Sequence, residues 1–269
     1  MSSPSNVDVA AERVARKKQP SALVMQRALK APVEAEFTFM NLVRFHTVKG
    51  HILPSVCRHK EEGEGGCPVC HFEKDLQLPS LPEMIFDQNL LEIRVPPTAE
   101  RPLISFNAFD ALRLVDHSQL PNVMVNASEK WQRANGHALP TISSPFDWTF
   151  TSEYGGTVGE GVRVEETSER IDLEKLKRPD PLLFYDAIQL YEDELADNGT
   201  GEMEVKVRAM PTNFFVLCRF YLRVDQVMVR VFDCRLYSEL HPLITDAAQI
   251  WQHLPIVEQK AHKLFYPSA

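Results

Sequence analysis

EVKVRAMPTNFFVLCRFYLRVDQVMVRVFDCRLY, residues 204–237, carries the strongest structural signal of the chain. Apolar and polar side chains alternate in it over three runs, which Pro211 and the pair Asp225-Gln226 separate. A period of two places successive side chains on opposite faces of a β-strand. The pattern therefore predicts three consecutive strands of an antiparallel sheet.

The central run, 213–224, has one fully apolar face, made of Phe214, Val216, Cys218, Phe220, Leu222 and Val224. Arg219 and Arg223 lie on the opposite face, and we group Arg230 of the next run with them. Two interpretations stay open for this arginine-bearing face. It is either a solvated ladder of ion pairs or a groove whose arginines receive a charged tail or loop of another protein.

Three further segments show alternation that favours strands. Residues 37–48 and 146–151 each predict one strand, and residues 84–95 predict a hairpin that turns at Asp87-Gln88-Asn89. The three glycines of GTVGEG (156–161) stand in the wrong order for a phosphate-binding loop, so we interpret that segment as a hairpin turn.

Helices are predicted at three places. Asn107 is placed to cap the first, with Asp110 at its third helical position. Residues 181–196 and 244–263 predict two more, the last one interrupted at Pro255. Hairpins outnumber crossovers in this order of elements, which predicts an α+β fold of largely antiparallel, twisted β-sheets with flanking helices in a single domain.

Composition and charge exclude several classes of protein. The 269 residues are 44% hydrophobic and 25% charged, which is typical of a globular domain. The formal charge of −8 argues against binding to nucleic acid, which requires a basic face. No apolar run approaches the roughly 20 residues that cross a bilayer. Five cysteines without a secretory signal indicate a reducing, cytoplasmic location.

The first 36 residues differ from the rest, because they are serine-rich at the start and locally basic. Asp8 and Glu12 interrupt the acid-poor pattern of an organelle-targeting peptide. We therefore expect residues 1–36 to be a flexible basic tail and residues 37–269 to be the folded domain.

Cysteine and histidine gather in residues 57–71, at Cys57, His59, Cys67, Cys70 and His71. Cys67 and Cys70 have the spacing of adjacent zinc ligands, but Cys57 and His59 are too close together for the usual second pair. The segment also matches the haem-attachment pentapeptide, without a periplasmic signal or a distal ligand. We interpret it as an exposed, reduced loop with no metal or other cofactor, and keep a zinc-dependent interaction module as an alternative.

Nothing in the sequence forms a recognisable catalytic motif. Cys218 alternates with apolar residues as core side chains do, and Cys234 has no base beside it in sequence. The acids of residues 192–194 point in different directions around a helix and cannot converge on one cation. A hydrolase built from dispersed residues remains a second alternative.

Several segments resemble one family, in the order in which that family has them: LPSLPEM (78–84), FNAFDAL (106–112), FDWTFTSEY (146–154), IDLEKLK (171–177), LYEDEL (190–195), residues 205–237, residues 254–258 and FYP (265–267). This is the TOR signalling pathway regulator-like family. The resemblance implies a non-catalytic protein that binds the catalytic subunits of type 2A, type 4 and type 6 serine/threonine phosphatases. It also implies a usually inhibitory role in nutrient and stress signalling.

The same resemblance implies which residues face the phosphatase: Asp110, Ile171, Arg230, Val231 and Asp233. The family often has methionine at the position of Val231. Residues 57–71 look like an insertion, and the basic tail is not a family feature. We expect arginines and aspartates of a cleft to pair with charges on the phosphatase, and Ile171 and Val231 to supply an apolar centre.

Overall fold

The computed structural model describes residues 31–54, 67–78, 81–115, 152–194, 199–224, 228–239, 243–251 and 258–265. From Val33 onward the described residues belong to one compact unit, Val33–Ala269. The unit therefore begins before the expected boundary at residue 37, because Val33–Glu36 already form part of the first strand. Among the described residues, no helix is both long and apolar enough to cross a bilayer.

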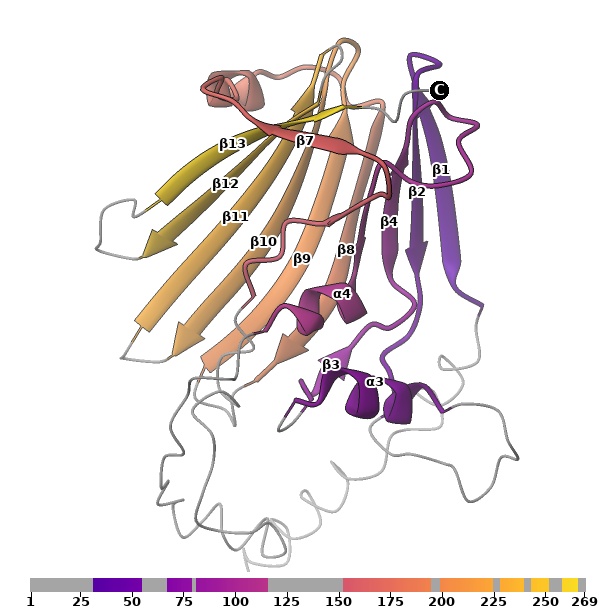
Figure 1. Ribbon diagram of the computed structural model, residues 1–269, viewed down its shortest axis with the longest axis vertical. Helices are drawn as coiled ribbons and strands as arrows, with labels where there is room; N and C mark the ends of the chain where they lie inside the picture. Colours follow the sequence, from indigo (N-terminus) through magenta and orange to yellow (C-terminus); the bar gives the residue numbers. More distant parts are fainter. Residues whose placement is uncertain are drawn as a thin grey trace, which may run out of the picture. The chain divides into compact units, whose positions relative to one another are not determined.

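The described strands form two antiparallel sheets (Figure 1). The smaller has the order β1 (Val33–Phe39), β2 (Val43–Lys49), β4 (Leu90–Arg94), β5 (Ile104–Asn107) and β6 (Thr157–Val158). The larger has the order β3 (Met84–Ile85), β8 (Phe184–Asp193), β9 (Gly199–Ala209), β10 (Phe214–Val224), β11 (Met228–Ser238), β12 (Leu243–Trp251), β13 (Glu258–Phe265) and β7 (Arg163–Glu166). The helices of the described residues are α3 (Pro68–Leu76), α4 (Ala108–Arg113) and the 3₁₀ helix η2 (Leu173–Lys177). The predicted α+β class with antiparallel sheets is confirmed.

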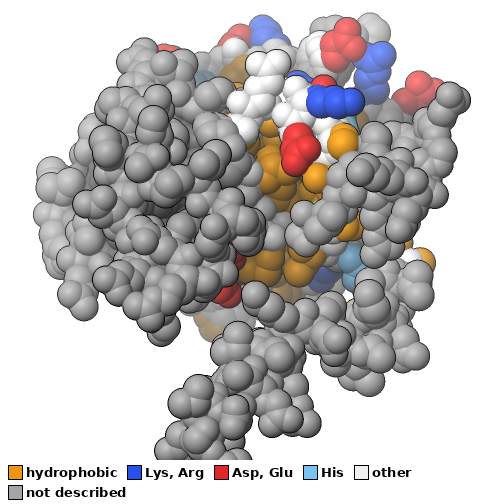
Figure 2. Space-filling model, turned by 90° about the horizontal axis from the view of Figure 1, so that it is seen from below, with side chains coloured by type: hydrophobic (Ala, Val, Ile, Leu, Met, Phe, Trp, Pro, Cys, Tyr) orange, Lys and Arg blue, Asp and Glu red, His pale blue; other side chains and the backbone are white. Residues whose placement is uncertain are grey.

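Aromatic rings join the two sheets. Phe37 of β1 stacks on Phe184 of β8 at 5.2 Å between ring centroids, and Phe45 of β2 meets Phe214 of β10 edge to face at 5.0 Å. Such ring pairs add stability beyond the area that they bury. Seen from the end that carries α3, apolar side chains gather in the middle of the face (Figure 2).

Two buried polar side chains also join the sheets. Asp186 of β8 accepts a hydrogen bond from Thr47 Oγ1 at 2.6 Å and pairs with Lys49, both of β2. Asn89 accepts from the backbone N–H of Gly50 at 2.7 Å and donates to the carbonyl of Gln189 at 2.6 Å. Both side chains are satisfied, as burial requires.

The strands predicted from residues 204–237 are confirmed as β9, β10 and β11. In β10 the residues of the apolar face that the structure describes are buried, and Cys218 is one of them. The helix after Asn107 is confirmed as α4, since the Asn107 side chain accepts from the backbone N–H of Asp110 at 2.8 Å. The strand predicted at 146–151 lies outside the described residues.

Two of the predicted helices are strands. The described part of 181–196 contains β8, which pairs with β9, and the described parts of 244–263 lie in β12 and β13, which pair with each other. Glu192 and Asp193 accordingly lie in a strand, where Asp193 is buried. At both places pairing with the next strand along the chain decided the structure, against the local pattern.

Predictions of single strands and hairpins were also wrong in places. Residues 37–48 form β1 and β2, with Met40 and Asn41 in the left-handed region between them. Residues 84–95 are not a hairpin, because β3 pairs with β8 while β4 pairs with β2 and β5. Residues 156–161 are not a hairpin turn, because they include β6, and the turn after β6 leads to β7 in the other sheet.

Candidate protein-binding site

The larger sheet has two chemically different faces. Its inner face carries Phe214, Cys218 and Phe220 and packs against the smaller sheet. Its outer face carries the alternate residues. In the register of β10 with β11, Arg219 faces Asp233, and both lie on the outer face. The sequence pattern had grouped Arg230 with Arg219 and Arg223, and this was wrong. Arg230 is opposite Leu222 on the inner face and does not share their surface.

Asp233 is held on the outer face by two arginines. Arg219 donates from Nε to Oδ1 at 2.6 Å and from Nη2 to Oδ2 at 2.9 Å, and Arg235 donates from Nη2 to Oδ2 at 2.6 Å. The Asp233 side chain is 1% exposed, whereas that of Arg219 is 38% exposed. The hydrogen bond to Asp233 raises the pKa of Arg219. Asp233 therefore fixes the orientation of the guanidinium groups, and Arg219 is the more accessible side chain.

Ile171 lies on the same outer face, but it is buried. It packs with Met210, Phe215 and Tyr237 in a second apolar cluster. This packing holds the η2 segment, Ile171–Arg178, against the sheet. Lys175 of η2 reinforces the contact by donating to Tyr237 Oη at 3.0 Å and by pairing with Glu239.

A groove of about 310 Å³ opens between the η2 segment and the outer face. Its lining includes three large apolar side chains, Leu176, Tyr185 and Phe215, and three cations, Lys206, Arg208 and Arg235. Its volume is at the lower end for pockets that hold a ligand. The predictions had missed Tyr185, Lys206 and Arg208, although the alternation of residues 205–210 already placed Lys206 and Arg208 on one face.

Asp110 and Arg230 lie elsewhere, on the inner side of the larger sheet. Asp110 Oδ2 accepts from Asn107 Nδ2 at 2.8 Å and from Thr157 Oγ1 at 2.6 Å. Arg230 Nη2 is 3.7 Å from Glu153 Oε1, and desolvation by burial lowers its pKa. Residues 153–157, which contact both residues, cross the inner face by way of Tyr154, whose carbonyl accepts from Cys218 Sγ.

The structure thus divides the five expected residues into two groups. Val231, Asp233 and Ile171 belong to the outer face, where half-buried Val231 is opposite Tyr221. Asp110 and Arg230 belong to the inner side. A partner that contacts both groups directly has to reach around the larger sheet, so the outer group and its groove form the more compact candidate site.

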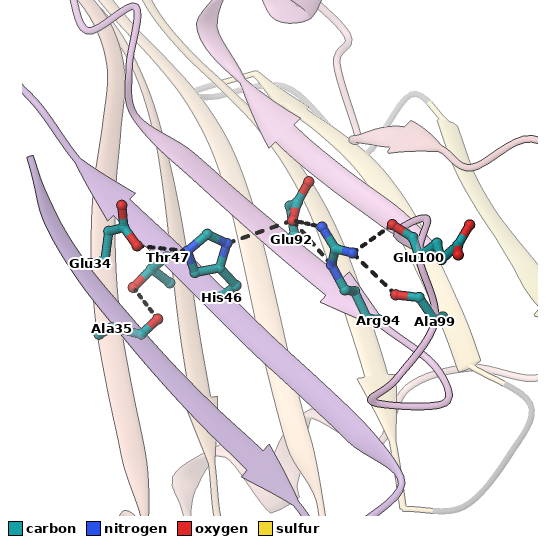
Figure 3. Close-up of polar contacts among 8 residues, drawn as sticks. All are labelled: Glu34, Ala35, His46, Thr47, Glu92, Arg94, Ala99 and Glu100. Atoms are coloured by element: carbon teal, nitrogen blue, oxygen red, sulfur yellow. Dashed lines mark hydrogen bonds and ion pairs between the residues drawn. The ribbon is translucent and has the colours of Figure 1, made fainter.

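The outward face of the smaller sheet also carries charge (Figure 3). His46 lies between Glu34 and Glu92, with each ring nitrogen 3.6 Å from a carboxylate oxygen. Arg94 pairs with Glu92 at 2.6 Å and donates to the carbonyls of Ala99 and Glu100. These charged groups pair with one another and hold the loop after β4. The contacts within the chain therefore account for these charges on this face.

The structure describes only part of the segment rich in cysteine and histidine, residues 57–71. Cys67 precedes α3, Cys70 lies in its first turn, and His71 pairs with Asp75 at 2.7 Å. No three metal-binding side chains converge among the described residues, but Cys57 and His59, which a zinc site would also use, lie outside them. The zinc alternative therefore stays a prediction.

Two cysteines of the larger sheet are buried on its inner face. Cys218 and Cys234 are cross-strand neighbours, and burial raises the pKa of both thiols, that of Cys234 to about 11. A thiol with such a pKa is protonated at neutral pH and is a poor nucleophile. Their position is that of core side chains.

Comparison with known proteins agrees with the resemblance drawn from the sequence. The family model described as "TIP41-like family" matches residues 84–263. A TIP41-like protein of Caenorhabditis elegans is 40% identical over 263 residues, covering 88% of this chain and 92% of its own length. The human TIP41-like protein is 38% identical, with 72% of this chain and 80% of its own length covered. A Saccharomyces cerevisiae protein named "Type 2A phosphatase activator TIP41" is 38% identical, covering 60% of this chain and 49% of its own length.

Proposed function

The chain belongs to the TIP41-like family, and we propose that it is a non-catalytic regulator that binds the catalytic subunits of type 2A serine/threonine phosphatases. The observation that carries this proposal is its relationship to the fungal proteins named type 2A phosphatase activators. The outer-face groove agrees with a protein partner, because hydrogen bonds orient its Arg208 and Arg235 and the ring of Tyr185 is exposed beside them.

The names of the fungal relatives raise the question of whether binding activates or inhibits the phosphatase. Those names state activation, whereas the family resemblance of the sequence implied inhibition. We propose that binding inhibits the isolated catalytic subunit. We further propose that type 4 and type 6 subunits are partners, and that the protein acts in the cytoplasm in TOR-dependent nutrient and stress signalling.

A non-catalytic role is supported by the chemistry of the described nucleophile candidates. Cys218 and Cys234 are buried and carry raised thiol pKa values. Their burial leaves a substrate no access to either sulfur. Binding, and not turnover, is the activity that the accessible groups of the outer face favour.

The test is binding of the purified full chain to a purified type 2A catalytic subunit, with phosphatase activity measured in the same samples. Saturable binding with a parallel fall in activity is expected. Binding with raised activity would retain the partner and reverse the proposed direction. Absence of binding at micromolar concentration, with the protein shown to be folded, would refute the proposal.

A further inference from the structure

We propose that Thr157 is a positioning residue for phosphatase binding. Thr157, which is itself held by Tyr154, fixes the carboxylate of Asp110 through Oδ2 and leaves Oδ1 to a hydrogen-bond donor of the phosphatase. This inference rests on the proposed function and on the role expected for Asp110. Neither the family relationship nor the sequence pattern assigns a role to Thr157 or Tyr154.

The first turn of α4 departs from the usual capping arrangement. Asn107 caps the helix, and Asp110 is at its third position, from which an acidic side chain ordinarily accepts the backbone N–H of the capping residue. In this protein that N–H donates to Tyr154 Oη at 3.3 Å. The Tyr154 hydroxyl thus takes the place of the Asp110 carboxylate in the cap, and among the described residues the carboxylate accepts from side chains only.

A chain of hydrogen bonds leads from Tyr154 to Asp110. Thr157 Oγ1 donates to Asp110 Oδ2 at 2.6 Å, and a hydroxyl has only one proton to donate. The Tyr154 hydroxyl, 3.1 Å from Thr157 Oγ1, is therefore the donor in that contact. Successive hydrogen bonds polarise one another, which strengthens the last bond, the one to the carboxylate.

Tyr154 is anchored firmly enough to position its neighbours. It is 1% exposed, and its ring packs edge to face with Phe106 at 6.2 Å between centroids. Its hydroxyl also donates to the carbonyl oxygen of Ser105 at 3.2 Å, so that its proton is shared between two acceptors. Burial raises the pKa of Tyr154, so the phenol keeps this proton at neutral pH. The fixed hydroxyl therefore sets the place of Thr157 Oγ1.

The two oxygens of the Asp110 carboxylate have different surroundings. Oδ2 accepts from Thr157 Oγ1 and from Asn107 Nδ2, the latter at 2.8 Å. Within the part of the chain that the structure describes, no group donates to Oδ1. Asp110 is half-buried and Thr157 is exposed, so a partner can reach this end of the side chain. A carboxylate that is already oriented accepts a bond from a partner at a low entropic cost.

Thr157 lies where its hydroxyl contributes little to the stability of the fold. It belongs to β6, an edge strand of two residues that are both exposed. A hydrogen bond between exposed groups adds little to the free energy of folding, because water competes for the same groups. Loss of the hydroxyl should therefore change the orientation of the Asp110 carboxylate more than the stability of the protein.

The experiment measures the affinity of the full chain and of its variants for the purified type 2A catalytic subunit. Thr157→Val keeps the β-branched shape but removes the hydroxyl, so it should weaken the affinity about fivefold to tenfold with an unchanged urea midpoint. Thr157→Ser, which restores the hydroxyl, should recover most of that loss.

Thr38→Val is the matched control. Thr38 is an exposed threonine on β1, the opposite edge strand of the same sheet. The control should keep the affinity of the parent within about twofold.

A double-mutant cycle separates positioning from a structural role. If Thr157 acts through Asp110, Thr157→Val should cause no further loss of affinity in an Asp110→Ala background. Losses that simply add, or a Thr157→Val variant that binds as the parent does, would overturn the inference and leave the proposed function standing. A lowered urea midpoint of Thr157→Val with rapid hydrogen exchange in α4 would assign the hydroxyl to the helix and overturn it as well. If the folded parent fails to bind, the proposed function falls and the inference with it.

Discussion

The carboxylate of Asp233 and the guanidinium of Arg219 form a two-point contact across β10 and β11, with Nε 2.6 Å from Oδ1 and Nη2 2.9 Å from Oδ2. Arg235 binds the same carboxylate from the other side. Because Asp233 is buried and the arginines are more exposed, this residue affects both the stability of the sheet and the surface that a partner meets.

The first prediction concerns Asp233→Leu. It should remove phosphatase binding and also destabilise the fold by about 3 kcal/mol, the lower end of the range for a broken buried pair, because Arg219 remains partly solvated. Urea unfolding monitored by circular dichroism measures the loss. Arg219→Gln, which removes the more exposed partner, should cost less stability. A Leu variant as stable as the parent would show that Asp233 serves binding alone.

The sequence was sufficient to predict the central strands, because residues 204–237 keep a period of two without interruption in each run. It failed at β8 for an identifiable reason. A β-bulge between Gln189 and Tyr191 buries Leu190 and Tyr191 in succession. Two adjacent buried positions break the period of a strand and imitate that of a helix.

The candidate site was predictable only in part. Alternation placed Arg219 opposite the apolar face, and the structure agrees, whereas Asp233 was named only through the family resemblance. The groove depends on where η2 packs on the sheet and on the register of β8 with β9, both of which bring together residues that are not neighbours in sequence. Local patterns carry no information about such contacts, so Tyr185 and Arg208 were not recognised as neighbours.

A second prediction separates capping from binding at Asp110. Asp110→Asn keeps an oxygen that accepts from Thr157 but loses the charge, so it should weaken phosphatase binding with little change in stability. Asn107→Ala removes the N-cap of α4 and should cost about 1 kcal/mol in the free energy of unfolding. Equal affinities of Asp110→Asn and the parent would assign Asp110 to the helix end alone.

A third prediction concerns the acid sensitivity of the η2 segment. The hydrogen bond from Lys175 lowers the pKa of Glu239 below its ordinary 4.5, and the bond to Glu239 raises that of Lys175. A carboxylate with a lowered folded-state pKa stabilises the fold above its unfolded-state pKa, and that stabilisation is lost as the pH falls through the lower folded-state value. Hydrogen exchange in residues 171–178 should therefore show loss of protection below about pH 4.5.

The control for this third prediction is Glu239→Gln. It should show the weaker protection of residues 171–178 already at neutral pH and should lose the dependence on acid. The side chains of Lys175 and Glu239 are 25% and 44% exposed, so solvent weakens the pair, and the effect should be confined to η2 and leave global unfolding nearly unchanged. If the parent and the variant show the same acid profile, Ile171 and Leu176 hold the segment without help from the ion pair.

The fourth prediction tests the position of the cysteines. Cys218 and Cys234 are 1% and 6% exposed, Gly155 lies against Cys234, and burial raises both thiol pKa values. Neither thiol should react with Ellman's reagent at pH 8 in the folded protein, and both should react in guanidinium chloride. Mass spectrometry after alkylation of the folded chain should find labels on Cys67 and Cys70, which are partly exposed. Rapid labelling of Cys234 in the folded state would show that residues 153–157 leave the inner face readily, and with them the contacts of Asp110 and Arg230.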